Sequence, residues 1–404
     1  MESQLREITS LLELESDERT IMLGIWGMSG VGKTTLARAV HNSISDQFEG
    51  LCFLADVRQK SHDLGIVTLQ ETLLCEIVEE KDNKFADVSE IIPLLRQRFH
   101  RKKILLILDD VSEPEQLKSL AGGCDWFGSG SRVIITTRDR RLLLDHGVDR
   151  EYALDPLDEE EALELFCWKA FENKEPDPVY MNLSKQVVRY SNGIPLVLEL
   201  IGSYLFDKLI VKWKSVLKTH RRFSTIANGL NDMIFWILKI CYDSLDEDVK
   251  TIFLDIACCF HGYELDHVTY LLLNGRGFHP GYGLQVLISK SFVKIDGGLV
   301  KVHDLIKDLA IKIFYQESPS DPGKRSRLWY YKDVLKVLRQ RTGTSCVEVL
   351  KIDLPKGEEV HWDGTGFKKM TNLKILEIRN ARFSEIPKIF PNNLKVLIWK
   401  GCFN

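Results

Sequence analysis

The sequence predicts a multidomain chain in which an α/β layer with a parallel sheet is followed by a helical bundle and then by short repeated strands. Over roughly the first 150 residues, short apolar runs alternate with amphipathic segments. The middle of the chain shows helical periodicity, and its end repeats a leucine spacing. With 404 residues, 44% of them hydrophobic, the chain is also long enough for several packed domains.

Four short apolar runs are predicted to form the parallel sheet. Each is rich in Ile, Leu and Val and precedes a longer amphipathic segment, as strands buried on both faces of a sheet require. The runs are 21–26, the segment around Phe53, 104–108 and 132–137. This alternation predicts crossover helices between successive strands.

The stretch GMSGVGKTT follows the first predicted strand and precedes a helical pattern, and its spacing is that of a phosphate loop. Glycines let successive backbone N–H groups curl around a β-phosphate, and the helix N-terminus adds positive potential. Lys33 would reach the outer phosphates, and the Thr34 hydroxyl would bind Mg²⁺. A glycine-rich turn with only a structural role is the alternative. The predicted nucleotide-binding residues are Gly27, Gly30, Val31, Gly32, Lys33, Thr34 and Thr35.

Two aspartates follow the strand at 104–108. Asp109 is predicted at the carboxyl edge of the sheet, opposite the phosphate loop, where it would hold Mg²⁺ together with Thr34. Asp110 could orient a water for hydrolysis, but a helix cap or a surface acid explains it equally well. Both interpretations stay open.

Arg138 follows directly on the strand at 132–137. It could reach a γ-phosphate as a charge sensor, although an arginine after a strand is usually a solvated surface group. Its position relative to the phosphate loop and to the strand that ends in the two aspartates favours the sensor. The candidate catalytic residues are therefore Asp109, Asp110 and Arg138.

Two weaker motifs lie further along. In GIPLVLELIG, Pro195 stands at a helix start, and the surface could lie against a purine or belong to a core helix. In KVHDLIKDLA, the simplest interpretation is a helix cap by Asp304 beside an incidental His303.

After Pro156 the pattern is helical to about residue 275, beginning at a predicted cap by Asp158. A helix, a two-stranded hairpin turned at 296–298 and a last helix follow, in the order of a winged-helix unit. Winged helices often bind DNA. Residues 236–313, however, hold eight Lys/Arg against ten Asp/Glu, a net of −2, which argues against DNA contact.

The segment 373–378 recurs at 394–399, an offset of 21 residues, and 347–352 precedes it by 26. This spacing is typical of leucine-rich repeats, in which each short strand adds a row to a curved sheet; chance recurrence in a Leu-rich segment is the alternative. The predicted domains are a P-loop nucleotide-binding α/β domain at 1–155, a helical domain at 156–235, a winged-helix domain at 236–325, and a linker with truncated leucine-rich repeats at 326–404.

The bulk composition excludes some classes of protein. A formal charge of −4 and a pI of about 6.2 give no overall basic field for nucleic acid or membrane surfaces. Nine scattered cysteines without metal-binding spacing indicate reduced thiols, and so a cytoplasmic or nuclear protein. The polar N-terminus and the short apolar run at 194–206, which carries Glu199, predict no secretion signal and no membrane span.

These elements in this order resemble the NB-ARC module of plant intracellular immune receptors, a branch of the signal-transduction ATPases that includes the apoptotic protease activators. The resemblance covers about residues 5–320. Several stretches are similar to the subclass that carries an N-terminal TIR domain: CFLADVRQKS, the Asp-Asp-Val followed by Ser112, IFLDIACCF and SRLWYYKDVLKVL.

The resemblance assigns the weaker motifs. The MHD motif of the family appears as Val302-His303-Asp304, which implies that His303 meets the β-phosphate of bound ADP. The GLPL motif appears as 193–196, which makes Pro195, packed on the nucleotide, and Leu196 cofactor-binding candidates. Arg138 matches the sensor of the TTR motif.

The sequence departs from the family pattern in places. Ser29 stands where glycine is commoner, which the turn tolerates if its φ is negative. We identify no TIR domain and only about three repeats in the sequence. The chain therefore resembles a switch that lacks its TIR output domain and most of its repeat sensor.

The resemblance implies a molecular switch with ADP or ATP and Mg²⁺ as cofactors, closed with ADP and active with ATP. The alternative is a multiple-turnover ATPase of the remodelling type. A P-loop kinase and a DNA-binding regulator are less favoured. We expect at most a slow ATPase and no TIR NADase activity. We expect protein partners, by self-association or with a TIR-bearing receptor, and no direct nucleic acid.

Overall fold

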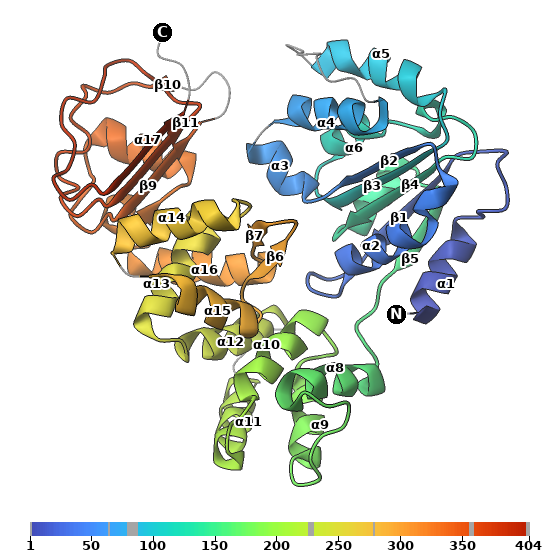
Figure 1. Ribbon diagram of the computed structural model, residues 1–404, viewed down its shortest axis with the longest axis horizontal. Coiled ribbons are helices and arrows are strands. Elements are labelled where there is room, and N and C mark those ends of the chain that lie inside the picture. Colours follow the sequence, from blue (N-terminus) through green and yellow to red (C-terminus); the bar gives the residue numbers. More distant parts are fainter. Residues whose placement is uncertain are drawn as a thin grey trace. The chain divides into compact units, whose positions relative to one another are not determined.

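The computed structural model describes residues 2–63, 65–78, 88–224, 230–277, 279–354 and 359–400 (Figure 1). The chain divides into two compact units, Met1–Pro156 and Leu157–Asn404, and each is described by itself. Among the described helices, none combines the length and the apolar character that crossing a bilayer needs. The eight cysteines of these ranges are all unpaired, as expected for reduced thiols.

The first unit is built on a parallel sheet. Its described strands pair in the order β2-β3-β4-β1-β5, and each neighbouring pair is parallel. The strands are β1 Ile21–Trp26, β2 Gly50–Leu54, β3 Ile104–Val111, β4 Arg132–Thr137 and β5 Arg150–Ala153. The first four confirm the predicted runs; β5 was not predicted.

Helices cover both faces of this sheet (Figure 1). Along β3, Leu105 and Ile107 pack with helices α1 and α2, while Leu106 and Leu108 pack with α4, α5 and α6. The helices are α1 Glu2–Leu11, α2 Lys33–Ile44, α3 Val57–Asp63, α4 Ile66–Val78, α5 Val88–Phe99, α6 Pro114–Leu120 and α7 Arg140–His146, with short 3₁₀ turns at Ser45–Gln47 and Cys124–Trp126. The burial of β3 on both faces explains its continuous apolar sequence.

Helix α1 is fixed to the sheet by a buried arginine. Arg132, on β4, donates to the carbonyl oxygens of Leu12, Glu13, Ser16 and Arg19, just past the end of α1. A cation at this end satisfies carbonyl groups that have no partner within the helix. Sequence reasoning did not predict this helix.

The second unit begins with helices. Asp158 caps α8 as predicted, because its side chain accepts from the backbone N–H groups of Glu160 and Glu161 at 3.0 and 2.8 Å. Pro195 is the first residue of α10. The helices are α8 Glu159–Phe171, α9 Met181–Tyr190, α10 Pro195–Leu205, α11 Ile210–Ser224, α12 Leu230–Asp243, α13 Glu247–Asp255, the π-helix Ile256–Phe260, α14 Leu265–Arg276, α15 Gly281–Ser289, α16 Asp304–Glu317 and α17 Tyr331–Gln340, with a 3₁₀ turn at Pro322–Lys324.

The predicted winged-helix order is confirmed. Helix α15 is followed by the antiparallel strands β6 Lys294–Asp296 and β7 Leu299–Lys301, and then by α16. Gly297 and Gly298 turn the hairpin with φ of 58° and 79°, values that glycine adopts most easily.

A second parallel sheet lies near the C-terminus, in the order β13-β11-β9-β8. Its strands are β8 Arg327–Leu328, β9 Val349–Asp353, β11 Ile375–Arg379 and β13 Val396–Lys400; β10 Glu359–Val360 and β12 Arg382–Phe383 form a separate short ladder. Leu350, Leu376 and Leu397 are partners across neighbouring strands. The three predicted repeat segments therefore stack in register.

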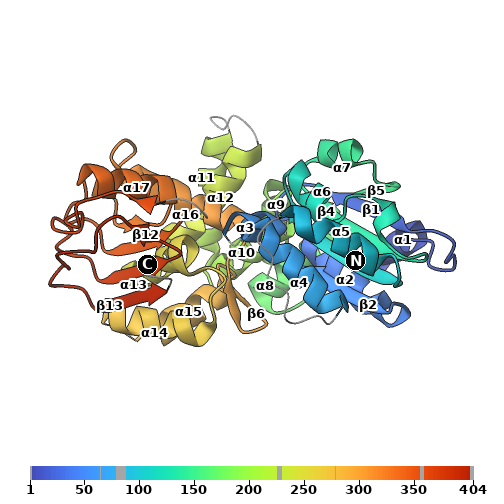
Figure 2. The ribbon, with the colours of Figure 1, turned by 90° about the horizontal axis from the view of Figure 1, so that it is seen from above.

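Strands β9 and β11 of this repeat sheet are buried on both faces, whereas Leu397 on β13 is 47% exposed. Leu350 and Leu376 pack in a cluster with α17, whereas Val349, Ile375 and Val396 pack in the same cluster as the winged-helix residues. Helix α14 lies beside β13 (Figure 2).

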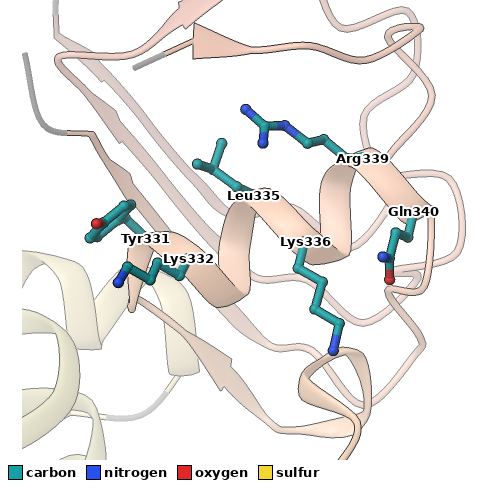
Figure 3. Close-up of a pocket in the computed structure, with 6 residues that line it drawn as sticks. All are labelled: Tyr331, Lys332, Leu335, Lys336, Arg339 and Gln340. Atoms are coloured by element: carbon teal, nitrogen blue, oxygen red, sulfur yellow. The ribbon is translucent and has the colours of Figure 1, made fainter. Parts of the chain in front are cut away.

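Helix α17 also lines a surface groove of about 400 Å³, shown in Figure 3. Its lining residues are Tyr331, Lys332, Leu335, Lys336, Arg339 and Gln340. None of the predicted site residues belongs to this lining.

Candidate nucleotide-binding site

The phosphate loop connects β1 to α2, as the sequence predicts. Gly30 and Gly32 adopt φ of 79° and 109°, which glycine adopts most easily. Ser29 is not among the residues with positive φ, so the turn accommodates a serine there without strain. A Cβ on Gly27 would lie 2.6 Å from the carbonyl oxygen of Leu154. The loop therefore needs glycine at positions 30 and 32 because their φ is positive, and at position 27 because a side chain would collide with the Leu154 carbonyl.

Lys33 and Val31 hold the loop from two sides. The Lys33 Nζ donates to the carbonyl oxygens of Gly27 and Met28 at 2.7 and 2.8 Å. The Val31 side chain is 4% exposed and packs in the apolar cluster of α1 and α2. Thr34 and Thr35 are exposed in the first turn of α2.

The two predicted metal ligands lie in contact. The Thr34 Oγ1 donates to Asp109, at 2.9 Å from Oδ1 and 3.0 Å from Oδ2. Asp109 is 1% exposed and also accepts from the Thr136 hydroxyl at 2.7 Å. Burial raises the pKa of Asp109 to about 6, against the opposing effect of the hydrogen bonds from Thr136 and Thr34. A hydroxyl and a carboxylate so placed are ligands that suit Mg²⁺.

Asp110 lies between two guanidinium groups. Its Oδ2 is 2.9 Å from the Arg58 Nε, and its Oδ1 is 3.5 Å from the Arg138 Nε. Its own φ is 56°, and its backbone N–H donates to the Thr136 hydroxyl at 2.8 Å. The carboxylate is thus an ion-pair partner of both Arg58 and Arg138.

Sequence reasoning missed two residues of this group. Thr136 is bonded to both aspartates, but within a strand of six buried residues it reads as an ordinary β-branched residue. Arg58, on α3, is 52 positions away from Asp110. The feature that could have identified Thr136 is a hydroxyl near the carboxyl end of β4, the strand that pairs with β3 beside the aspartates.

The remaining predicted residues belong to the second unit. Pro195 is partly buried, and Leu196 is 5% exposed within the helical core. His303 is exposed and is the N-cap of α16, because its Nδ1 accepts from the Leu305 N–H at 3.2 Å. The interpretation of Asp304 as the cap is wrong: its backbone is already helical, and the extended φ/ψ of a cap falls on His303.

The structure therefore gathers Gly27–Thr35, Asp109, Asp110 and Arg138 at one edge of the first sheet, while Pro195, Leu196 and His303 stand in the second unit. Among the described ranges, no group of three or more His, Cys, Asp or Glu residues is arranged to hold a metal ion by itself. A cation at Thr34 and Asp109 would thus share its coordination with phosphate oxygens or water.

Two family models match this chain. The model described as NB-ARC domain matches residues 1–176. The model described as disease resistance protein Roq1-like, winged-helix domain, matches residues 246–318. The second match covers the α15, β6, β7 and α16 order described above.

Curated relatives are similar over nearly the whole chain. TMV resistance protein N of Nicotiana glutinosa is 36% identical over 98% of the chain and 34% of its own length. Disease resistance protein RUN1 of Vitis rotundifolia is 35% identical over 94% of the chain and 28% of its own length. The chain thus spans about a third of the length of these relatives.

Among solved structures, the chain is similar to a signal transduction ATPase with numerous domains, which has a tetratricopeptide repeat sensor, from Pyrococcus horikoshii. The TM-score is 0.48 at 18% identity, over 82% of this chain and 44% of the other. The phosphate loop, the winged-helix order and the matches to family models and curated relatives all indicate the same family. The chain belongs to the NB-ARC family of plant disease-resistance proteins.

Proposed function

We propose that this chain is the ADP/ATP-binding switch of a plant immune receptor, closed with ADP and active with ATP. The observation that carries the proposal is the contact between Thr34, in the phosphate loop, and Asp109, at the end of β3. It brings the proposed phosphate-binding loop and the proposed cation ligand together at the carboxyl edge of a parallel sheet, where such sheets bind nucleotides.

Thr34 and Asp109 would hold Mg²⁺, which would neutralise charge on the nucleotide phosphates. Lys33 and the N-terminus of α2 would bind the phosphates. Arg138 would act as the sensor of a third phosphate. Its ion pair with Asp110 restrains its direction, and Arg58 supports the same carboxylate.

In the ADP-bound state we propose that His303 contacts a phosphate. The Nδ1 of His303 accepts from Leu305, so the neutral ring carries its proton on Nε2, from which it can donate to a phosphate oxygen. Pro195 and Leu196 would border the base. A roughly 100-fold preference of ADP for the closed form corresponds to about 2.7 kcal/mol, enough to shift a balanced switch.

The relatives are named as resistance proteins, which favours the switch over the multiple-turnover ATPase. We further propose a cytoplasmic or nuclear location, supported by the unpaired cysteines of the described ranges. The proposed partners are proteins, through self-association or a TIR-bearing receptor.

The test is to purify the chain, denature it and identify the released nucleotide by chromatography. We expect close to one ADP per chain. Lys33→Arg should abolish retention, because the longer, planar guanidinium does not fit the loop carbonyls that hold Lys33. Lys118→Arg, on the exposed face of α6, is the matched control. Rapid multiple turnover without retained ADP would establish the ATPase instead.

A further inference from the structure

We propose that Tyr263 is a positioning residue that transmits the position of the repeat sheet to the His303 segment, and so sets how firmly ADP is held. The inference rests on the proposed function, because it assumes that His303 contacts the nucleotide. All of its contacts lie within the second unit.

The side chain of Tyr263 is bonded to the repeat sheet. Its hydroxyl donates to the Glu377 Oε1, on β11, at 3.0 Å. Glu377 is 1% exposed and forms an ion pair with Arg379. The guanidinium of Arg379 lies 4.5 Å from the centre of the tyrosine ring, and the Lys351 ammonium lies 5.2 Å from it. Two strands of the repeat sheet therefore hold one tyrosine of the winged-helix region.

Burial and the Glu377 carboxylate raise the pKa of the Tyr263 hydroxyl. The hydroxyl therefore remains protonated at neutral pH. It can act as a donor to Glu377 throughout the physiological range.

The backbone of the same residue is bonded to the wing. The Tyr263 carbonyl accepts from the Val300 N–H at 2.8 Å, and the Gly262 N–H donates to the Val300 carbonyl at 2.7 Å. Glu264 and Leu299 form an antiparallel bridge next to them. Residues 262–264 thus run as a third antiparallel segment beside β7.

Strand β7 leads directly to His303. The Val302 N–H donates to the Nδ1 of His261 at 3.0 Å, and His303 then caps α16 through its own Nδ1. His261 immediately follows the π-helix Ile256–Phe260. Residues 261–263 therefore fix the backbone on the N-terminal side of His303, while α16 fixes it on the other side.

These contacts form a continuous path from Glu377 through Tyr263 and Val300 to His303. A displacement of the repeat sheet that pulls on Glu377 must move the Tyr263 backbone or break the hydroxyl bond. In the first case β7 moves with it, and the imidazole of His303 leaves its position. Coupling between the two ends would appear as a change in ADP release when one of these contacts is removed.

The test compares release of a fluorescent ADP analogue from the full chain and from variants. Tyr263→Phe removes only the hydroxyl. We expect release to become about three- to tenfold faster, because one hydrogen bond to a charged group is lost and part of its free energy affects the nucleotide site. Tyr180→Phe is the matched control. Its hydroxyl lies 3.5 Å from the Lys208 carbonyl in the same unit, away from β7, and release should stay within about twofold of the original.

Hydrogen exchange separates positioning from a general loss of stability. In Tyr263→Phe we expect faster exchange of the Val300 and Val302 amides, while amides in α8 and α10 keep their protection. Release that is unchanged in Tyr263→Phe, with or without a lower unfolding midpoint, would overturn the proposal.

A double variant tests the route. If Tyr263 acts through His303, Tyr263→Phe should add nothing to the release rate of His303→Asn, which keeps an acceptor for the α16 cap. Additive effects would overturn the path. If His303→Asn itself leaves release unchanged, the proposed function fails. If it accelerates release and Tyr263→Phe does not, only this inference fails.

Discussion

The hydroxyl of Thr136 donates to Asp109 at 2.7 Å and accepts from the backbone N–H of Asp110 at 2.8 Å. One hydroxyl thus fixes both the proposed metal ligand and the carboxylate that pairs with Arg138. We expect Thr136→Val, which keeps the shape but loses the hydroxyl, to weaken Mg²⁺-dependent nucleotide binding by about tenfold and to lower the free energy of unfolding by about 1–3 kcal/mol. Calorimetric titration and urea unfolding measure the two effects.

Thr136→Ser is the control for this change, because it keeps the hydroxyl and loses only a methyl group. It should bind nucleotide nearly as the original does. Equal binding by the Val and Ser variants would show that Thr136 has no part in orienting the site.

Asp304→Val should accelerate ADP release. Asp304 is the first helical residue after the His303 cap, where a carboxylate interacts favourably with the helix N-terminus. Its loss loosens the segment that carries His303. Asp308→Val, exposed one turn further along α16, controls for the lower helix propensity of valine. If both variants release ADP at the original rate, the proposed contact of His303 with the nucleotide is refuted.

The stability of the second unit should fall in acid because of Asp255. Burial by itself raises the pKa of Asp255, but the guanidiniums of Arg327 and Arg276 outweigh it, and the net pKa lies below the usual value. A lowered pKa in the folded state gives stability that is fully present above the unfolded value of about 4 and is lost as pH falls through the folded value. Urea unfolding between pH 6 and pH 2.5 should show this loss.

Asp255→Asn should remove part of that acid dependence and destabilise the unit by about 3–5 kcal/mol at pH 7, since the buried guanidiniums of Arg327 and Arg276 both lose this carboxylate, while Arg276 keeps its ion pair with Glu348. Asp248→Asn, exposed on the same helix, should change little. An unaltered acid slope in Asp255→Asn would assign the dependence to other carboxyl groups, such as Glu348, whose pKa is also lowered.

Gly275→Ala should separate α14 from the repeat sheet. A Cβ on Gly275 would lie 2.4 Å from Cδ1 and Cγ1 of Ile375, which is 0% exposed. Alanine in a helix normally stabilises relative to glycine, so a loss of about 1–3 kcal/mol in urea unfolding would report the clash. Asn274→Ala, exposed on the same helix, is the control. A gain in stability by Gly275→Ala would show that the contact is loose.

Much of the fold follows from local sequence. The strands β1 and β4 begin and end where their apolar runs do, because strands buried on both faces tolerate few polar residues. The hairpin at 296–298 follows from two adjacent glycines. Strand β5 escaped prediction because it is short and contains Arg150 and Glu151; it stands at the sheet edge, where burial imposes no apolar pattern.

The parts of the site that could be predicted are those in which a local sequence pattern matches one chemical role. The phosphate loop and Asp109 have such signatures. Arg58 and Tyr263 do not, because their roles depend on partners 52 and 114 positions away, at Asp110 and Glu377. The cap of α16 shows a further limit: Asp304 is the better cap by residue preference, yet tertiary bonds to Val302 and the strand before it shift the helix start by one residue.

The burial of Val349, Ile375 and Val396 against the winged-helix residues limits what the first repeats can do. A solenoid recognises ligands through side chains that its sheet leaves open to solvent. Here the first position of each row is occupied by the protein itself, and only residues further along the strands, such as Lys351 and Ile398, stay partly exposed. The surface that these three rows leave for another molecule is therefore smaller than that of an uncovered sheet.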